Sequence, residues 1–88
     1  MKSYNKITGF TGIESESDKA IKVNIPIFSP NGHKVIDGQR WFPKSLVKIQ
    51  DDELYVESWF VAKQSNQDWR DNKWSFEAEG GISNTYEL

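Results

Sequence analysis

The chain has 88 residues, a formal net charge of −2 and no cysteine. Its length predicts one domain, residues 1–88, with a small hydrophobic core. The lack of cysteine excludes disulfides and thiolate metal sites and favours a reducing, cytoplasmic location. No apolar run is long enough to cross a bilayer, and the N-terminus has no signal-peptide pattern, so we expect a soluble protein without a membrane partner.

The first predicted elements are strands. Residues 6–13, KITGFTGI, are typical of a strand that bends at its glycines. Residues 20–28, AIKVNIPIF, alternate apolar and polar side chains, the pattern of a half-buried strand. Pro26 falls on the polar side of this strand and offers no N–H, which predicts an edge or a bulge at that point.

Two turns are predicted next. Residues 29–32, SPNG, combine proline with Asn-Gly, which tolerates a positive φ. Residues 33–36 form a short strand, and Asp37–Gly38 is of the type that joins two strands tightly. Strands at 39–43 and 53–57 follow, separated by the acidic turn 51–53.

The pattern changes to helical spacing at Ser58, a good N-cap residue, which predicts a helix at 58–66. Residues 73–78 return to alternation and predict a last strand. The predicted fold class is mainly β (α+β), a small antiparallel barrel-like or strongly bent sheet with one short helix. The predicted core residues are Ile21, Val23, Ile25, Trp41, Leu54 and Val56.

Three segments together carry a resemblance: ESDKAIKV (16–23), RWFPKSLV (40–47) and VESWFVAK (56–63). They resemble small uncharacterised proteins of phages and other mobile elements, whose pattern includes a W-[IV]-P-K-S strand. Phe42 stands where that pattern has an aliphatic residue, and 67–88 have no counterpart. The resemblance implies a small β-rich domain in a phage or plasmid setting, and implies no activity.

Catalytic and metal chemistry find little support in the sequence. His33 is the single histidine and has no cysteine to form a nucleophile–base pair with. Asp51, Asp52 and Glu53 are adjacent, which is typical of an acidic turn. No glycine pattern fits a phosphate loop. We therefore predict no catalytic residue, no metal site, no cofactor and no small-molecule substrate.

A strand that mixes basic and aromatic residues is the first candidate binding site. Single-strand binders stack bases on exposed rings within a positive groove. Strand alternation predicts that Arg40, Phe42 and Lys44 share one face, which Lys22 and Asn24 of the neighbouring strand could extend. These residues predict binding of single-stranded nucleic acid. The alternative is that Trp41 anchors the core while Phe42 packs under the helix.

Aromatic residues in and after the predicted helix are the second candidate. Trp59, Trp69 and Trp74 predict a protein-interaction patch, since tryptophan is enriched at interface hot spots. The alternative is that these rings close one end of the sheet. The sequence thus predicts a non-catalytic binding module for single-stranded nucleic acid or for a protein, such as a host factor that it binds or inhibits. Basic strand residues favour the first hypothesis. The sequence pI of about 5.3 and the acidic clusters at 14–18, 51–53 and 77–79 favour the second.

Overall fold

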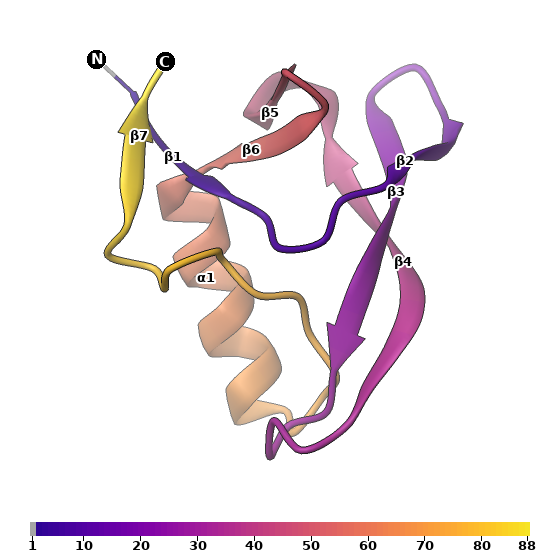
Figure 1. The fold of residues 1–88 in the computed structure, drawn as a ribbon, viewed down its shortest axis with the longest axis vertical. Helices are drawn as coiled ribbons and strands as arrows, with labels where there is room; N and C mark the ends of the chain where they lie inside the picture. The colour runs from indigo at the N-terminus through magenta and orange to yellow at the C-terminus, as the bar shows by residue number, and fades with distance from the viewer. Residues whose placement is uncertain (1) are drawn as a thin grey trace.

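The structure is a computed structural model that describes residues 2–88. Within these residues the chain forms two antiparallel sheets and a single α-helix (Figure 1). The predicted mainly β class is confirmed, but the sheets do not close into a barrel. The elements are β1 (Ser3–Lys6), β2 (Gly12–Glu16), β3 (Ala20–Phe28), β4 (Val35–Pro43), the 3₁₀ helix η1 (Lys44–Leu46), β5 (Val47–Gln50), β6 (Glu53–Glu57), α1 (Ser58–Arg70) and β7 (Thr85–Glu87).

A long hairpin dominates the first of these sheets, which has the order β2-β3-β4. The β3–β4 register is unbroken from Ala20 opposite Pro43 to Phe28 opposite Val35. Side chains of β3 alternate between buried and half-buried along its whole length, as predicted. Pro26 lies beyond the last residue of β3 that pairs with β2, Asn24, so its missing N–H costs no ladder hydrogen bond.

The predicted turn at Asp37–Gly38 is wrong, because both residues lie in the middle of β4. The hairpin turns earlier, where the Ser29 N–H donates to the Lys34 carbonyl at 2.8 Å. Gly38 has a different role from the one predicted: a Cβ at this position would overlap Cγ1 of Ile27 on β3. The glycine therefore permits close packing of two strands rather than a change of direction.

The second sheet has the order β5-β6-β1-β7. Asp51 and Asp52 join β5 to β6 with φ angles of 52° and 62°. Positive φ at both central residues suits the twist of a two-residue hairpin, and aspartate tolerates it. β1 pairs with both β6 and β7, so the two ends of the described chain lie side by side (Figure 1).

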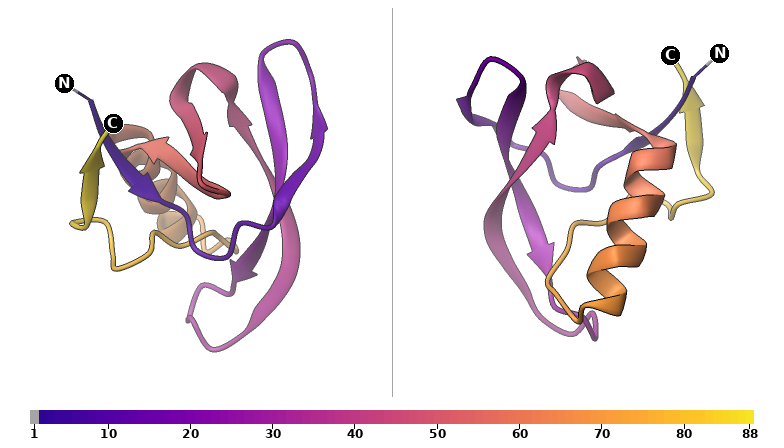
Figure 2. Two further views of the ribbon diagram at one scale, coloured as in Figure 1. Left: turned by 45° about the horizontal axis from the view of Figure 1, so that its top comes forward. Right: turned by 180° about the vertical axis from the view of Figure 1, so that it is seen from behind.

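Helix α1 begins at Ser58, as predicted, but runs to Arg70 and not to residue 66. The predicted N-cap is wrong: Glu57 occupies that position without a side-chain cap, and Ser58 Oγ is buried with no hydrogen-bond partner. The helix ends near the tip of the β3–β4 hairpin (Figure 2, right).

The predicted strand at 73–78 is wrong. This segment makes isolated bridges, Ser75 to Phe28 and Ala78 to Ile7, which belong to different sheets. Period-two alternation is present, but the backbone leaves each neighbour after one bridge, so no ladder forms. The segment instead connects the end of α1 to both sheets before β7.

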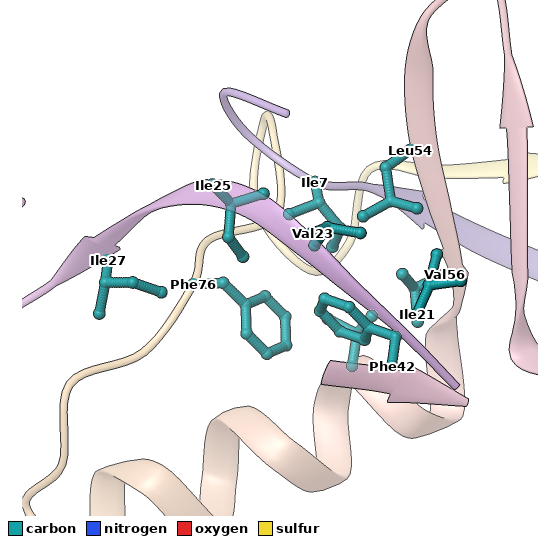
Figure 3. Packing of buried hydrophobic residues seen from close by; sticks show 10 residues of the cluster. Ile7, Ile21, Val23, Ile25, Ile27, Phe42, Leu54, Val56 and Phe76 are labelled. Atoms are coloured by element: carbon teal, nitrogen blue, oxygen red, sulfur yellow. The ribbon is translucent and has the colours of Figure 1, made fainter. Parts of the chain in front are cut away.

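The hydrophobic core lies between the two sheets and α1 (Figure 3). Five of the six predicted core residues are buried. Trp41 is the exception, with 48% of its surface exposed, whereas its neighbour Phe42 is fully buried. The core consists of Ile7, Ile21, Val23, Ile25, Ile27, Phe42, Leu54, Val56, Val61 and Phe76. Among residues 2–88, no helix has the length and apolar character that crossing a membrane requires.

Candidate binding surfaces

Phe42 cannot stack on a base in the folded chain, because its side chain is fully buried. Its ring makes edge contacts with Phe76 at 5.3 Å and with Phe60 of α1 at 6.3 Å between centroids. The predicted exposure of Phe42 on a binding face is therefore wrong. The alternative that Phe42 packs under the helix describes it correctly.

Arg40 lies on the same inner face of β4 and points toward α1. Its Nη2 is 3.0 Å from Asp68 Oδ2 and donates to Gln64 Oε1 at 3.2 Å. The guanidinium also lies 4.9 Å from the centre of the Phe76 ring, and Ser75 Oγ donates to Asp68 Oδ2 at 2.6 Å. Arg40 thus connects β4 to the helix and to the segment after it, and it is not free to bind phosphate.

Lys44 and Lys22, the other two predicted nucleic-acid contacts, lie in different settings. Lys44 Nζ pairs with Glu16 Oε2 at 2.7 Å. Lys22 stands opposite Trp41 in the ladder, with its Nζ 5.9 Å from the centre of the Trp41 ring. The four residues predicted to form one basic face are therefore divided between two faces of the hairpin.

The outer face of the β3–β4 hairpin combines Lys22 and Trp41 with a polar network. Gln39 Nε2 donates to Asn24 Oδ1 at 3.1 Å, and Asn24 Nδ2 donates to Glu14 Oε2 at 3.3 Å. Lys22 is predicted on the face of Arg40 and Phe42, because alternation within each strand predicts no register between the strands that contain Lys22 and Trp41. The correct turn would have placed these two residues opposite each other.

A shallow depression of about 520 Å³ adjoins this network and includes Asn24, Asp37, Gly38 and Gln39 in its lining. Lys22 and Lys44 do not line it, and the charged side chain that does is acidic. The depression therefore offers no positive groove for a phosphate backbone.

The three tryptophans of the predicted protein-interaction patch do not share one surface environment. Trp59 is at the first turn of α1, where its Nε1 donates to Glu57 Oε1 at 2.9 Å and its ring packs on Phe60. Trp69 is ten residues further along the helix, about 15 Å away along the axis. Trp74 follows the helix and is 39% exposed.

Trp69 is the most exposed of these tryptophans, at 76%. It borders a groove of about 280 Å³ between the tip of the β3–β4 hairpin and the segment after the helix. Apolar side chains on the other walls of the groove are Phe28, Pro30 and Phe76, and Lys73 and Glu77 supply charges of opposite sign.

The pKa of Glu57 is lowered from its ordinary value of 4.5. The main cause is the hydrogen bond from Trp59, and the ammonium of Lys2, 3.2 Å away, adds to it. Burial opposes this shift. Glu57 is thus held as a carboxylate at the junction of β6 and α1.

The pKa of Lys6 is raised from 10.5, although its largest single influence, burial, acts to lower it. The carboxylate of Glu79, 3.7 Å away, and the nearby Tyr86 and Tyr55 together outweigh burial. Lys6 therefore stays charged and links β1 to the segment before β7.

The predicted loop position of His33 agrees with the structure, where His33 is exposed and its backbone N–H donates to Asn31 Oδ1. Asp51 and Asp52 are turn residues, as predicted. Over residues 2–88 no group of three or more His, Cys, Asp or Glu side chains could hold a metal ion.

Comparisons with protein-family models, curated protein sequences and solved structures found no significant match to this chain. The resemblance to phage and mobile-element proteins therefore stays a prediction.

Proposed function

We propose that this chain is a non-catalytic protein-interaction module that binds its partner through Trp69 and the groove beside it. The observation that carries the proposal is the 76% exposure of Trp69 next to a groove of about 280 Å³ that has both apolar and polar lining residues. Such exposure leaves a large apolar surface in water and contributes little to folding. Tryptophan is among the residues that are enriched at interface hot spots.

The groove defines what kind of partner group fits. Phe28, Pro30 and Trp69 give the groove an apolar part that would accept an apolar side chain of the partner, and serine and asparagine residues line part of the remainder. Lys73 and Glu77 at the same groove offer one donor and one acceptor that fix the orientation of a bound segment. Trp59 contributes less in this proposal, because its indole N–H is already bonded to Glu57.

NMR of the indole N–H groups tests the proposal, because the chain has four tryptophans and hence four separate probes. Peptides selected from a displayed random library on the wild-type chain are titrated into the labelled protein. We expect the Trp69 signal to shift, and Trp69→Ala to weaken binding by about 2 kcal/mol or more. Trp59→Phe is the matched control on the same helix. Selected peptides that leave the Trp69 signal unmoved would contradict the proposal.

Binding of single-stranded nucleic acid is the second candidate, now resting on Lys22 and Trp41. An exposed ring with a lysine beside it is the minimal unit of base stacking plus phosphate contact. Titration of a labelled oligonucleotide at low salt should then shift the Trp41 indole and weaken with added salt. Because Asp37 and Glu14 lie on the same side of the hairpin, we expect this binding to be weaker than that of the protein partner.

The cytoplasmic location and the phage or mobile-element origin belong to this proposal. Their support is the absence of cysteine and the sequence resemblance. A host factor as the partner would fit both. Expression of the chain in a bacterial host, followed by crosslinking from a photoreactive residue at position 69 and from one at exposed Ile82, would identify partners specific to the Trp69 surface.

A further inference from the structure

β4 forms an open edge of the β2-β3-β4 sheet and runs along one margin of the molecule (Figures 1 and 2). The direction of its backbone groups follows from the ladder. The Lys44 N–H donates to the Lys19 carbonyl, and the Ser29 N–H donates to the Lys34 carbonyl. Antiparallel pairs alternate between bonded and non-bonded, so the even-numbered residues of β4 bond to β3. The odd-numbered residues therefore direct their N–H and C=O groups away from the sheet.

Apart from the carbonyl of Pro43, which has no N–H, these outward groups belong to Val35, Asp37, Gln39 and Trp41, and all four of these residues are exposed. No hydrogen bond within residues 2–88 satisfies their backbone groups outside the β3 ladder. Unpaired strand edges are templates for a further strand, and proteins normally protect them.

The other sheet edges carry that protection. β2 has a register shift between Ile13 and Ser15 and the acidic residues Glu14 and Glu16. β5 has four residues, including Lys48, and β7 has three. β4 has nine residues, an unbroken register and a single outward-directed charge, Asp37. Its exposed apolar side chains add surface that pairing would cover: Val35 and Ile36 at 55% and Trp41 at 48%.

We propose that β4 pairs antiparallel with β4 of a second copy of this chain, with the two-fold axis at Gly38. This register places Val35 opposite the partner's Trp41 and Asp37 opposite the partner's Gln39. All of the outward backbone groups of these four residues then find partners. The pair of Val35 and Trp41 joins a β-branched and an aromatic side chain, which is favourable across strands, and Gln39 places a neutral amide opposite the Asp37 carboxylate.

Neighbouring registers are less favourable. A shift of two residues one way places Asp37 opposite its own copy, and like charges directly opposite destabilise a strand pair. The opposite shift places Asp37 against the ring of Trp41. A shift of one residue places the outward N–H and C=O groups of one β4 opposite residues of the other β4 whose backbone groups are already bonded to β3. The register centred on Gly38 is thus the one that keeps the two Asp37 carboxylates apart and pairs Val35 with Trp41, so the outward residues of β4 are complementary to those of a second copy.

Sedimentation velocity of the whole chain from low micromolar to millimolar concentration tests the dimer. The contact is one strand wide, so we expect a reversible dimer that forms toward the upper end of this range. Gln39→Pro removes one outward N–H without removing a bond to β3, and should weaken the dimer by about tenfold or more. Val35→Lys changes an exposed side chain alone and should also weaken it, and it serves if the proline variant fails to fold.

Ile49→Pro on β5 is the matched control. The carbonyl of Leu54, the residue opposite Ile49, accepts a hydrogen bond from the Ile7 N–H, so the backbone groups of Leu54 point away from β5. Ile49 and Leu54 are therefore a non-bonded pair, and the Ile49 N–H also points out of the sheet. This variant should dimerise like the wild type. A chain that stays monomeric throughout the range would overturn the proposal, as would a dimer that Gln39→Pro leaves intact.

Engineered cysteines test the register, because the natural chain has none. Asp37→Cys mixed with Gln39→Cys places two thiols on directly opposite residues, about 5.5 Å apart between Cα atoms. Either variant alone places them on a diagonal of about 7–8 Å, beyond disulfide reach. We expect the mixed disulfide to exceed both symmetric ones well above the statistical ratio. A statistical mixture would overturn the register.

Discussion

The two faces of the β3–β4 hairpin differ in how far they bury two neighbouring aromatic residues. On the inner face Phe42 is fully buried among Phe60 and Phe76. On the outer face Trp41 keeps 48% of its surface exposed and has Lys22 beside its ring. Both rings are large and apolar, so the difference lies in what covers each face. α1 covers the inner face, and no element of residues 2–88 buries the outer one.

The same division applies to the charged residues. Arg40 on the inner face is bonded to Asp68 and Gln64 of α1, and its side chain is 20% exposed. Lys44, just after β4, pairs with Glu16, and both of these side chains are more exposed. The inner face thus holds the fold together, and the outer face and the open edge remain available for binding.

Alanine substitution of Phe42 and of Trp41 should give the largest difference in stability between the two faces. Phe42→Ala removes a fully buried ring and should lower the free energy of unfolding by about 3–5 kcal/mol. Trp41→Ala should lower it by less than about 1 kcal/mol, because the site is half exposed. Urea denaturation at low protein concentration measures both. Equal losses would mean that the two faces are not as different as their exposures indicate.

The ion pairs provide the next largest contrast. Asp68→Ala leaves Arg40 unpaired in a site where the two side chains are 20% and 10% exposed, and should cost about 3 kcal/mol. Glu16→Ala breaks the exposed pair with Lys44 and should cost at most about 1 kcal/mol. If thermal unfolding ranks these two variants the other way, Arg40 does not anchor α1 to β4.

Gly38 tests whether the hairpin depends on close packing at its centre. Gly38→Ala brings a methyl group against Ile27 and should cost about 1–3 kcal/mol. In an Ile27→Ala background the same change should cost at least about 1 kcal/mol less. Chemical denaturation of the double-mutant cycle measures this coupling. Additive losses would assign the effect to backbone freedom at residue 38 and not to the contact with Ile27.

The smallest expected change in stability concerns Glu57, which ends β6 in the second sheet. Its pKa is lower in the folded chain than the ordinary 4.5, so the stabilisation is present above that pH. It is lost as the pH falls below 4.5 and through the folded-state pKa. Trp59→Phe removes the main hydrogen bond to Glu57 and should reduce this acid-side loss of stability relative to wild type. If the free energy of unfolding of Trp59→Phe depends on pH in the same way as that of the wild type below pH 5, Trp59 does not lower the pKa of Glu57.

The sequence by itself determined the elements whose signals are local. The alternation in 20–28 determined which side chains of β3 are buried, and the change of spacing at Ser58 located the start of α1. It also determined that Trp41 and Phe42 point to opposite faces, because side chains alternate along any strand.

Tertiary structure alone decided which of those two faces is inside. That choice depends on α1, whose Phe60 and Asp68 contact Phe42 and Arg40 from positions about 20 to 30 residues further along the chain. Asp37–Gly38 has the composition of a turn, yet β4 continues through it in an unbroken ladder with β3, and Ile27 on β3 fills the space that a side chain at residue 38 would need. Residues 73–78 alternate like a strand, but their backbone partners lie in two different sheets. Local sequence patterns determine the side of a strand to which a side chain points. Burial and strand pairing depend on which segments, distant in the sequence, pack against that side.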